Sequence, residues 1–156
     1  MRRIIFLDID GVLNSVRYDR ERREHDGNID ETRLVLLKGL IDATGAEIVL
    51  SSSWRKHWGM IPEECDAIGE ELNREFCKFG LSISDKTPVL SAIERGIEIK
   101  AWLDDHVSEV ESFVILDDMF FGFAGLEEHF VKTDSRIGRG LEERHVEKAR
   151  RILLGE

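Results

Sequence analysis

The sequence is poor in cysteine and proline, and it has no long apolar run. Its two cysteines, Cys65 and Cys77, fall in one predicted helix at a spacing that suits neither a disulfide nor a zinc knuckle. We therefore expect buried free thiols in a reducing compartment. Because the apolar runs are far too short to cross a bilayer and the first residues show no signal-peptide pattern, we expect a cytoplasmic protein without a membrane partner.

A surplus of positive charge is also missing. The chain has 22 basic and 32 acidic residues, which gives a formal net charge of −10. A protein that grips duplex nucleic acid over its whole surface is normally basic, so any contact with nucleic acid here would be confined to a local patch. The length of 156 residues and the hydrophobic content of 42% suit one globular domain over residues 1–156.

Short apolar runs of strand character alternate with segments of helical periodicity. The strand-like runs are Arg3–Leu7, Glu47–Leu50, Phe113–Leu116 and Phe130–Val131. The helical segments run from Asn28 to Thr44, from Pro62 to Gly80, from Ala92 to His106 and from Leu141 to Leu154, with capping boxes predicted at Asn28/Glu31 and Ser91/Glu94. This alternation predicts an α/β fold: a three-layer Rossmann-like parallel sheet with helices on both faces, which binds its ligand at the carboxyl ends of the strands.

The first strand-like run ends in two carboxylates, Asp8 and Asp10, followed by Gly11. Alternation along a strand would send both side chains to one face, where two like charges repel unless a cation lies between them. Mg²⁺ is the natural candidate, since it binds a few carboxylates together with water and phosphate oxygens. A solvated turn is the simpler alternative for this tetrapeptide. An EF-hand loop is disfavoured, because the glycine comes too early and a strand precedes it.

Polar residues also follow the other strand-like runs. Ser51, Ser52 and Ser53 follow the second run, Asp117-Asp118 the third, and Thr133-Asp134 the fourth. Each group taken alone is an ordinary turn or helix cap. Because parallel strands bring their carboxyl ends to one rim, we expect these groups to gather with Asp8 and Asp10 in one site.

With these motifs the chain resembles the haloacid dehalogenase (HAD) superfamily of phosphohydrolases. Asp8-Ile9-Asp10-Gly11 is similar to the first motif of that superfamily, Ser51/Ser52 to the second and Asp117-Asp118 to the fourth. Arg95 is the best match to the third motif, and Lys86 and Lys100 are less well placed. The segments 49–55 and 95–99 resemble the small HAD domains related to RNA-repair proteins. The gaps between motifs are too short for a large cap domain.

The resemblance implies a chemistry for each motif. Asp8 would be the nucleophile that forms an aspartyl-phosphate, and Asp10 the acid and base. Mg²⁺ would be held by Asp8, Asp117 and the backbone carbonyl of Asp10, with Asp118 helping directly or through water. The remaining catalytic groups bind the phosphoryl oxygens, and they are Ser51 or Ser52 and Arg95. The chain departs from many members in having an arginine at the third motif, and in having Met119-Phe120-Phe121 rather than a later acid after the fourth.

The resemblance therefore predicts a Mg²⁺-dependent phosphomonoester hydrolase. Without a large cap the site would admit a polymer end, and a nucleic-acid end with a 3′-phosphate is our preferred substrate. Two local features fit this substrate but also have structural explanations. One is the loop with Arg17, Arg20, Arg22 and Arg23, which is equally consistent with a solvated surface, and the other is the pair Trp54 and Trp58, which suits stacking on a base or core packing.

Four alternatives stay open at the level of sequence. The enzyme could act on a small metabolite, or pass the phosphate to another hydroxyl as a phosphotransferase. A receiver-like signalling module shares the fold and the carboxylates, but its phosphoacceptor lies on a central strand other than the first. A non-catalytic phosphate-binding module is disfavoured by the complete set of carboxylates.

Overall fold

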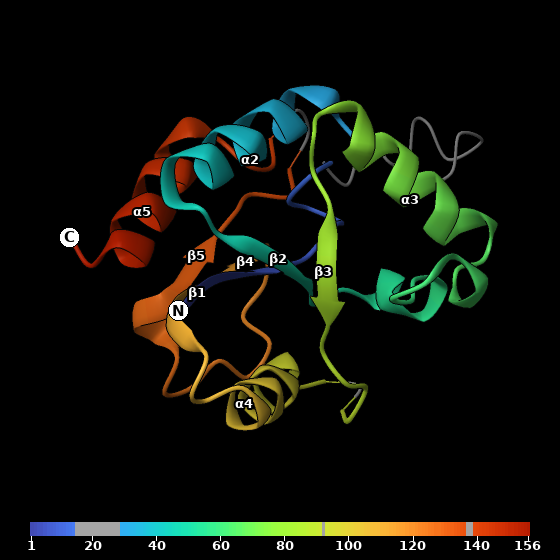
Figure 1. The fold of residues 1–156 in the computed structure, drawn as a ribbon. Helices are drawn as coiled ribbons and strands as arrows, with labels where there is room; N and C mark the ends of the chain where they lie inside the picture. The colour runs from blue at the N-terminus through green and yellow to red at the C-terminus, as the bar shows by residue number, and fades with distance from the viewer. Residues whose placement is uncertain (15–28, 92, 137–138) are drawn as a thin grey trace.

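The computed structural model describes residues 1–14, 29–91, 93–136 and 139–156, and its centre is a five-stranded parallel sheet (Figure 1). The strand order is β3-β2-β1-β4-β5. The strands are β1 Arg2–Leu7, β2 Glu47–Leu50, β3 Ile83–Lys86, β4 Val110–Asp117 and β5 Phe130–Lys132. The helices are α2 Glu31–Thr44, α3 Ala67–Lys78, α4 Arg95–Asp105 and α5 Glu143–Leu154. The arginine-rich loop predicted between β1 and α2 lies outside the described residues.

Helices cover both faces of the sheet, as the sequence predicts. In β1, Ile5 and Leu7 belong to one buried cluster with residues of α2, α3 and α5. The alternate side chains, Ile4 and Phe6, pack with Ile99 and Trp102 of α4 on the other face. Figure 1 shows this division, with α2, α3 and α5 above the sheet and α4 below it. Burial on both faces explains why the strands read as continuous apolar runs rather than as an alternating pattern. The predicted α/β Rossmann-like fold is therefore confirmed.

The ends of α2 are fixed by its flanking residues. Asp30 is the N-cap, and its side chain accepts a hydrogen bond from the Thr32 N–H at 3.0 Å. The capping box predicted at Asn28 and Glu31 is therefore wrong, because Glu31 is the first residue of the helix and not the third; Asn28 itself lies outside the described residues. The predicted end at Gly45 is confirmed, since this residue has a φ of 69° and bonds back to the Ile41 carbonyl.

The second predicted helix is shorter than the sequence pattern suggests. Pro62–Glu64 is only a 3₁₀ turn, and α3 begins after Asp66, whose side chain accepts from two helical N–H groups. This new start places Cys65 before the helix, while Cys77 lies on its exposed side. The expectation of two buried thiols on one helix is therefore wrong, although both cysteines are free.

The strand β3 is absent from the sequence prediction. It reads Ile-Ser-Asp-Lys, and all four residues are half-buried at the edge of the sheet. A short edge strand needs few apolar residues, so its sequence gives no hydrophobic pattern. The later helices begin a little further along than predicted, at Arg95 and Glu143.

No described element forms a second domain over the carboxyl edge of the sheet. Between β2 and β3, the structure describes only two 3₁₀ helices and α3. Within the described ranges, no helix combines the length and the apolar character that a membrane span requires.

Candidate active site

Hydrogen bonds extend β1, β2 and β5 by one residue each and so build one polar rim. The Ser51 N–H donates to the Leu7 carbonyl at 2.8 Å, and the Asp8 N–H donates to the Leu116 carbonyl at 3.0 Å. The Thr133 N–H likewise donates to Asp117 at 2.9 Å. Polar side chains from β2, β1, β4 and β5 therefore stand next to one another at the carboxyl edge, as the sequence predicts.

Three carboxylates converge at the middle of this rim. Asp8, Asp117 and Asp118 each offer one oxygen, and these oxygens lie within 4.8 Å of one another. Asp8 and Asp117 are 3% and 1% exposed. Gly11 makes the approach of Asp118 possible, because a Cβ at Gly11 would lie 2.4 Å from the Asp118 Oδ2. The glycine of the first motif is therefore required by packing as well as by its φ of 83°.

Arg95 is the cation that faces these carboxylates. It is the first residue of α4, and its Nη1 lies 3.1 Å from Asp8 Oδ1 and 2.8 Å from Asp117 Oδ2. Its guanidinium carbon lies 4.3 Å from the centroid of the Phe121 ring. The two lysines that also fit the third motif point elsewhere: Lys86 Nζ bonds the carbonyls of residues 55 and 58, and Lys100 Nζ bonds the Ala124 carbonyl. The structure thus brings only Arg95, of these three, to the carboxylates.

Burial and mutual repulsion disfavour the ionised form of the carboxylates. The pKa of Asp8 is raised by burial and by the negative charge of Asp118, and Arg95 reverses this only in part. The pKa of Asp117 is raised by burial and by Asp8. The pKa of Arg95 is raised, because the charges of Asp8 and Asp117 outweigh its own burial. A divalent cation among these oxygens would remove the repulsion, and a set of oxygen donors alone suits a hard ion such as Mg²⁺.

The carboxylate of Asp10 is not part of this cluster. Its Oδ2 accepts from the Trp54 indole N–H at 3.1 Å, and its Oδ1 accepts from the Asn14 amide at 3.2 Å. The side chain is exposed at the edge of the rim. Because β1 ends at Leu7, strand alternation does not govern Asp10, and Asp8 groups instead with Asp117, the last residue of β4, and with Asp118. A role for the Asp10 backbone carbonyl in holding metal stays a prediction.

The two candidate serines differ in what their hydroxyls do. Ser52 caps the 3₁₀ helix Ser53–His57, and its Oγ accepts from the Trp54 backbone N–H at 3.2 Å. Ser51 is 1% exposed, and its Oγ has no hydrogen-bond partner among the described residues. A buried hydroxyl without a partner is costly unless a ligand supplies one. Ser51 is therefore the better candidate for a ligand contact.

A buried ion pair joins the segment after β2 to α4. Arg55 Nη2 lies 2.7 Å from Glu98 Oε1, and Arg55 Nη1 donates to the Thr87 hydroxyl at 2.6 Å. Glu98 is fully buried, and its other oxygen accepts the backbone N–H groups of Leu90 and Ser91. Since Glu98 lies one helical turn after Arg95, this network fixes the start of α4 against the segment that carries Ser51.

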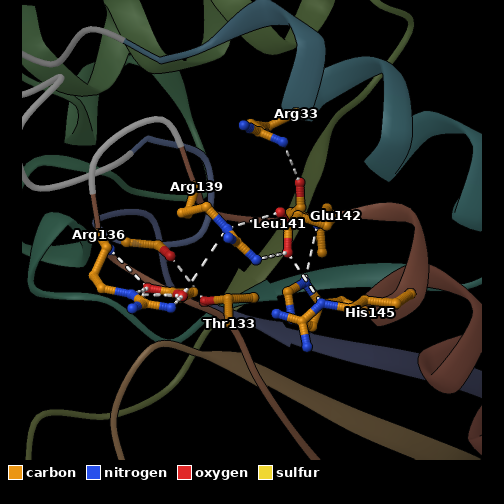
Figure 2. A network of polar contacts seen from close by, with 10 residues as sticks. Arg33, Thr133, Arg136, Arg139, Leu141, Glu142 and His145 are labelled. Atoms are coloured by element: carbon orange, nitrogen blue, oxygen red, sulfur yellow. Dashed lines mark hydrogen bonds and ion pairs between the residues drawn. The ribbon is translucent and has the colours of Figure 1, made fainter.

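An open pocket of about 430 Å³ lies beside Asp118 at the end of β5. Three basic side chains line it, and they are Lys132, Arg136 and Arg144. Figure 2 shows a polar network that includes Thr133, Arg136, Arg139 and Glu142. Arg136 pairs with Asp134 at 2.6 Å, and Arg139 pairs with Glu142 at 3.0 Å. The Thr133 hydroxyl ties this loop to the first motif, because it donates to the Gly11 carbonyl at 2.8 Å.

The family comparison agrees with this geometry. A family model described as the HAD domain in Swiss Army Knife RNA repair proteins matches residues 4–146. The chain belongs to this family of HAD domains. The match points to the phosphatase-type hydrolases of the HAD superfamily. Comparison with curated proteins and comparison with solved structures each give no match.

Four residues of this HAD domain were missed as parts of the site. Trp54 and Asn14 hold Asp10, while Arg55 and Glu98 link two of the motif-bearing segments. Trp54 was considered only for stacking on a base or for the core. Glu98 carries a weak signal, since it is a charged residue between Ile97 and Ile99, but its partner Arg55 lies in a polar stretch 43 residues away. The sequence gives no local pattern that would pair them.

Proposed function

We propose that this HAD domain is a Mg²⁺-dependent phosphomonoester hydrolase that works through an aspartyl-phosphate on Asp8. The observation that carries the proposal is the convergence of Asp8, Asp117 and Asp118 with Arg95 on one rim. Asp8 is the carboxylate of this group that directly follows β1, and its Oδ1 lies 3.1 Å from the arginine. The fit to a cation rests on the buried carboxylates, whose pKa values are raised in its absence.

Asp8, Asp117 and Asp118 would hold the metal ion. When bound, Mg²⁺ supplies positive charge that offsets the repulsion between an anionic nucleophile and an anionic phosphate. Arg95 adds a second positive charge on the same side of Asp8. Its planar guanidinium also presents several N–H groups to phosphoryl oxygens, whose negative charge it stabilises in the transition state. The unpartnered Ser51 hydroxyl supplies a further hydrogen bond to these oxygens.

The reaction proceeds in two steps. In the first, an Asp8 oxygen forms a bond to phosphorus while the bond from phosphorus to the leaving oxygen breaks, and Asp10 gives its proton to that oxygen. In the second, Asp10 takes a proton from a water molecule as the water oxygen bonds to phosphorus. The bond to Asp8 then breaks, which releases inorganic phosphate, restores the Asp8 carboxylate and leaves Asp10 protonated for the next turnover. The exposed position of Asp10 beside the rim suits contact with a leaving group and with water.

For the substrate, we propose a nucleic-acid end, such as a 3′-phosphate. The family description names RNA repair proteins, and the segment described between β2 and β3 is too short for a large cap domain. The pocket with Lys132, Arg136 and Arg144 lies directly beside Asp118, within reach of a second phosphate of the same substrate. The overall charge of −10 limits such contacts to a few nucleotides.

The test is a panel of phosphate esters with Mg²⁺, comparing small esters, nucleotides and oligonucleotides with 3′- or 5′-phosphates. We expect release of inorganic phosphate that stops after chelation and returns with Mg²⁺. Asp8→Asn should abolish release while the fold is kept, and Asp104→Asn, at an exposed position of α4, is the matched control. Phosphate release that survives thorough chelation, or a substantial rate in Asp8→Asn, would overturn the proposal. Transfer of phosphate to an added alcohol with little release would identify a phosphotransferase instead.

A further inference from the structure

We infer that Trp54 is a positioning residue for Asp10, the carboxylate that gives its proton to the leaving oxygen, and this inference rests on the function proposed above. The indole N–H of Trp54 lies 3.1 Å from Asp10 Oδ2. The first and second motifs of the site are thereby joined through a tryptophan side chain.

The contact helps to fix a side chain that the sheet and the core do not hold. Asp10 is exposed and lies three residues beyond the end of β1, so neither the sheet nor the core holds its carboxylate. Trp54 and Asn14 each donate one hydrogen bond, one to each oxygen. Two donors on two oxygens define the plane of a carboxylate as well as its position.

Trp54 is itself anchored on two sides. Its backbone N–H donates to the Ser52 hydroxyl at 3.2 Å, and its half-buried ring packs against the main hydrophobic cluster. Much of the side-chain entropy of an indole is therefore already lost before it meets Asp10. An indole also has one donor and no acceptor, so it cannot compete for the proton that Asp10 carries. Each oxygen of Asp10 keeps a second lone-pair position, which can carry the proton that Asp10 gives to the leaving oxygen.

If Trp54 positions Asp10, the effect of its substitution on the rate should depend on the leaving group. A proton donor accelerates departure of a strongly basic leaving oxygen, such as that of a sugar hydroxyl, far more than departure of a stable anion such as p-nitrophenolate. Loss of the Trp54 N–H should therefore slow cleavage of an alkyl phosphate selectively. A tryptophan that served only to pack the core would slow both reactions by the same factor when removed.

The chain offers a matched control in Trp58. This ring is 3% exposed, and its N–H donates to the Asn73 side chain at 2.9 Å, which belongs to α3 and not to the site. Replacing either tryptophan by phenylalanine removes one N–H and keeps an aromatic ring. Only the first substitution removes a donor to Asp10.

The experiment measures kcat and KM of Trp54→Phe and Trp58→Phe on p-nitrophenyl phosphate and on a ribose 3′-phosphate ester, with Mg²⁺. The ratio kcat/KM reports the step in which the leaving group departs. For Trp54→Phe we expect a loss of about tenfold or more on the ribose ester, carried by kcat, and less than about twofold on the nitrophenyl ester. Trp54→His, which keeps a ring N–H, should recover part of the loss and also serves if the phenylalanine variant does not fold. Trp58→Phe should change both substrates equally.

Equal losses of Trp54→Phe on the two esters, or no loss on either, would overturn the positioning role while the phosphatase function stands. A wild-type protein that hydrolyses neither ester with Mg²⁺ would overturn the proposed function and this inference together.

Discussion

The contacts of Arg95 with the carboxylates depend on the close packing of the start of α4. Gly96, the second residue of α4, makes its placement possible. A Cβ at Gly96 would lie 2.0 Å from the Gly122 carbonyl oxygen, so only glycine lets the start of α4 come so close to the loop after β4. That loop also supplies Phe121 beneath the guanidinium. The side chain then reaches Asp8 and Asp117 at the same time.

Substitution of Arg95 should therefore affect catalysis far more than substitution of the nearby lysine. We expect Arg95→Ala to lower kcat/KM by about 100-fold or more, the usual effect of losing a group that stabilises transition-state charge. Lys100→Ala, five residues further along the same helix and bonded only to the Ala124 carbonyl among the described residues, should change it by less than about threefold. Steady-state kinetics on one ester decides the matter. A larger loss in Lys100→Ala would mean that the third motif has been assigned to the wrong residue.

Asp117 should lower the stability of the metal-free protein although it is needed to bind the metal. Its pKa is raised by burial and by Asp8. At pH 8 and without metal, the ionised form is therefore disfavoured in the folded state, which lowers the free energy of unfolding. Asp117→Asn removes this cost and keeps the acceptor for the Met119 N–H. We expect the variant to be more stable than wild type in EDTA by about 1 kcal/mol, and to lose the stabilisation by Mg²⁺. Thermal unfolding with and without Mg²⁺ tests both statements. A variant that melts below wild type in EDTA would contradict them.

At the scale of elements, the sequence predicts those strands and helix ends that leave a local pattern. The four apolar strand runs and the end of α2 at Gly45 are confirmed, because burial on both faces and a left-handed C-cap leave direct signals. The edge strand β3 has no such signal, since it buries little. The start of α3 was misplaced because the Asp66 side chain caps the helix four residues after Pro62, the residue expected to begin it.

In the candidate site, the sequence predicts which strand ends meet but not which side chains bond to one another. Strand ends in a parallel sheet meet at one rim, so the grouping of Asp8, Asp117 and Asp118 followed from topology. Contacts made by side chains across long sequence separations did not follow. The bond from Trp54 to Asp10 and the Arg55–Glu98 pair depend on how the segment after β2 packs, which no short pattern specifies.

The start of α5 should be sensitive to pH. The Glu142 N–H donates to His145 Nδ1 at 3.0 Å, so this nitrogen carries no proton and the imidazole is neutral. Burial lowers the pKa of His145, as do Arg144 and Arg139, while Glu142 and Asp134 oppose them. A lowered histidine pKa stabilises the fold at pH values above the unfolded value of about 6.5, and this stability is lost as the pH falls toward the folded pKa.

We therefore expect the free energy of unfolding to decrease between pH 7.5 and 5.5. His145→Gln removes the titrating ring but keeps an acceptor for the same N–H. The loss of stability on acidification should be smaller in this variant by up to about 1 kcal/mol. Urea unfolding at several pH values measures the difference. Parallel curves for the two proteins would show that His145 does not contribute.

At the scale of the whole molecule, the net charge restricts how a nucleic-acid substrate can bind. With a net charge of −10, long-range attraction of a polyanion is weak, and among the described residues the local cations beside Asp118 favour it. An oligonucleotide would then touch few phosphates. The proposed substrate predicts a log–log salt dependence of kcat/KM with a slope on the order of −1 to −3.

Arg144 offers a test of this binding mode. Its side chain is 63% exposed at the pocket, with one ion pair to Glu142. Arg144→Ala should lower kcat/KM by about threefold to tenfold on a 3′-phosphorylated oligonucleotide and leave a small ester unchanged. Arg74→Ala, an equally exposed arginine on α3 with its own ion pair, is the control. Equal activity of wild type and Arg144→Ala on the oligonucleotide would exclude this pocket from substrate binding.

The central claim is that Asp8 carries the phosphate during turnover, and trapping the phosphorylated enzyme tests it most directly. The enzyme would be mixed with substrate and Mg²⁺, quenched in acid and treated with borohydride, which reduces an aspartyl-phosphate to homoserine. Peptide mass spectrometry then locates the modified position. We predict conversion at Asp8 alone, dependent on Mg²⁺ and absent in Asp8→Asn. Conversion at Asp117 or Asp118, or none in an enzyme that is turning over substrate, would contradict the account.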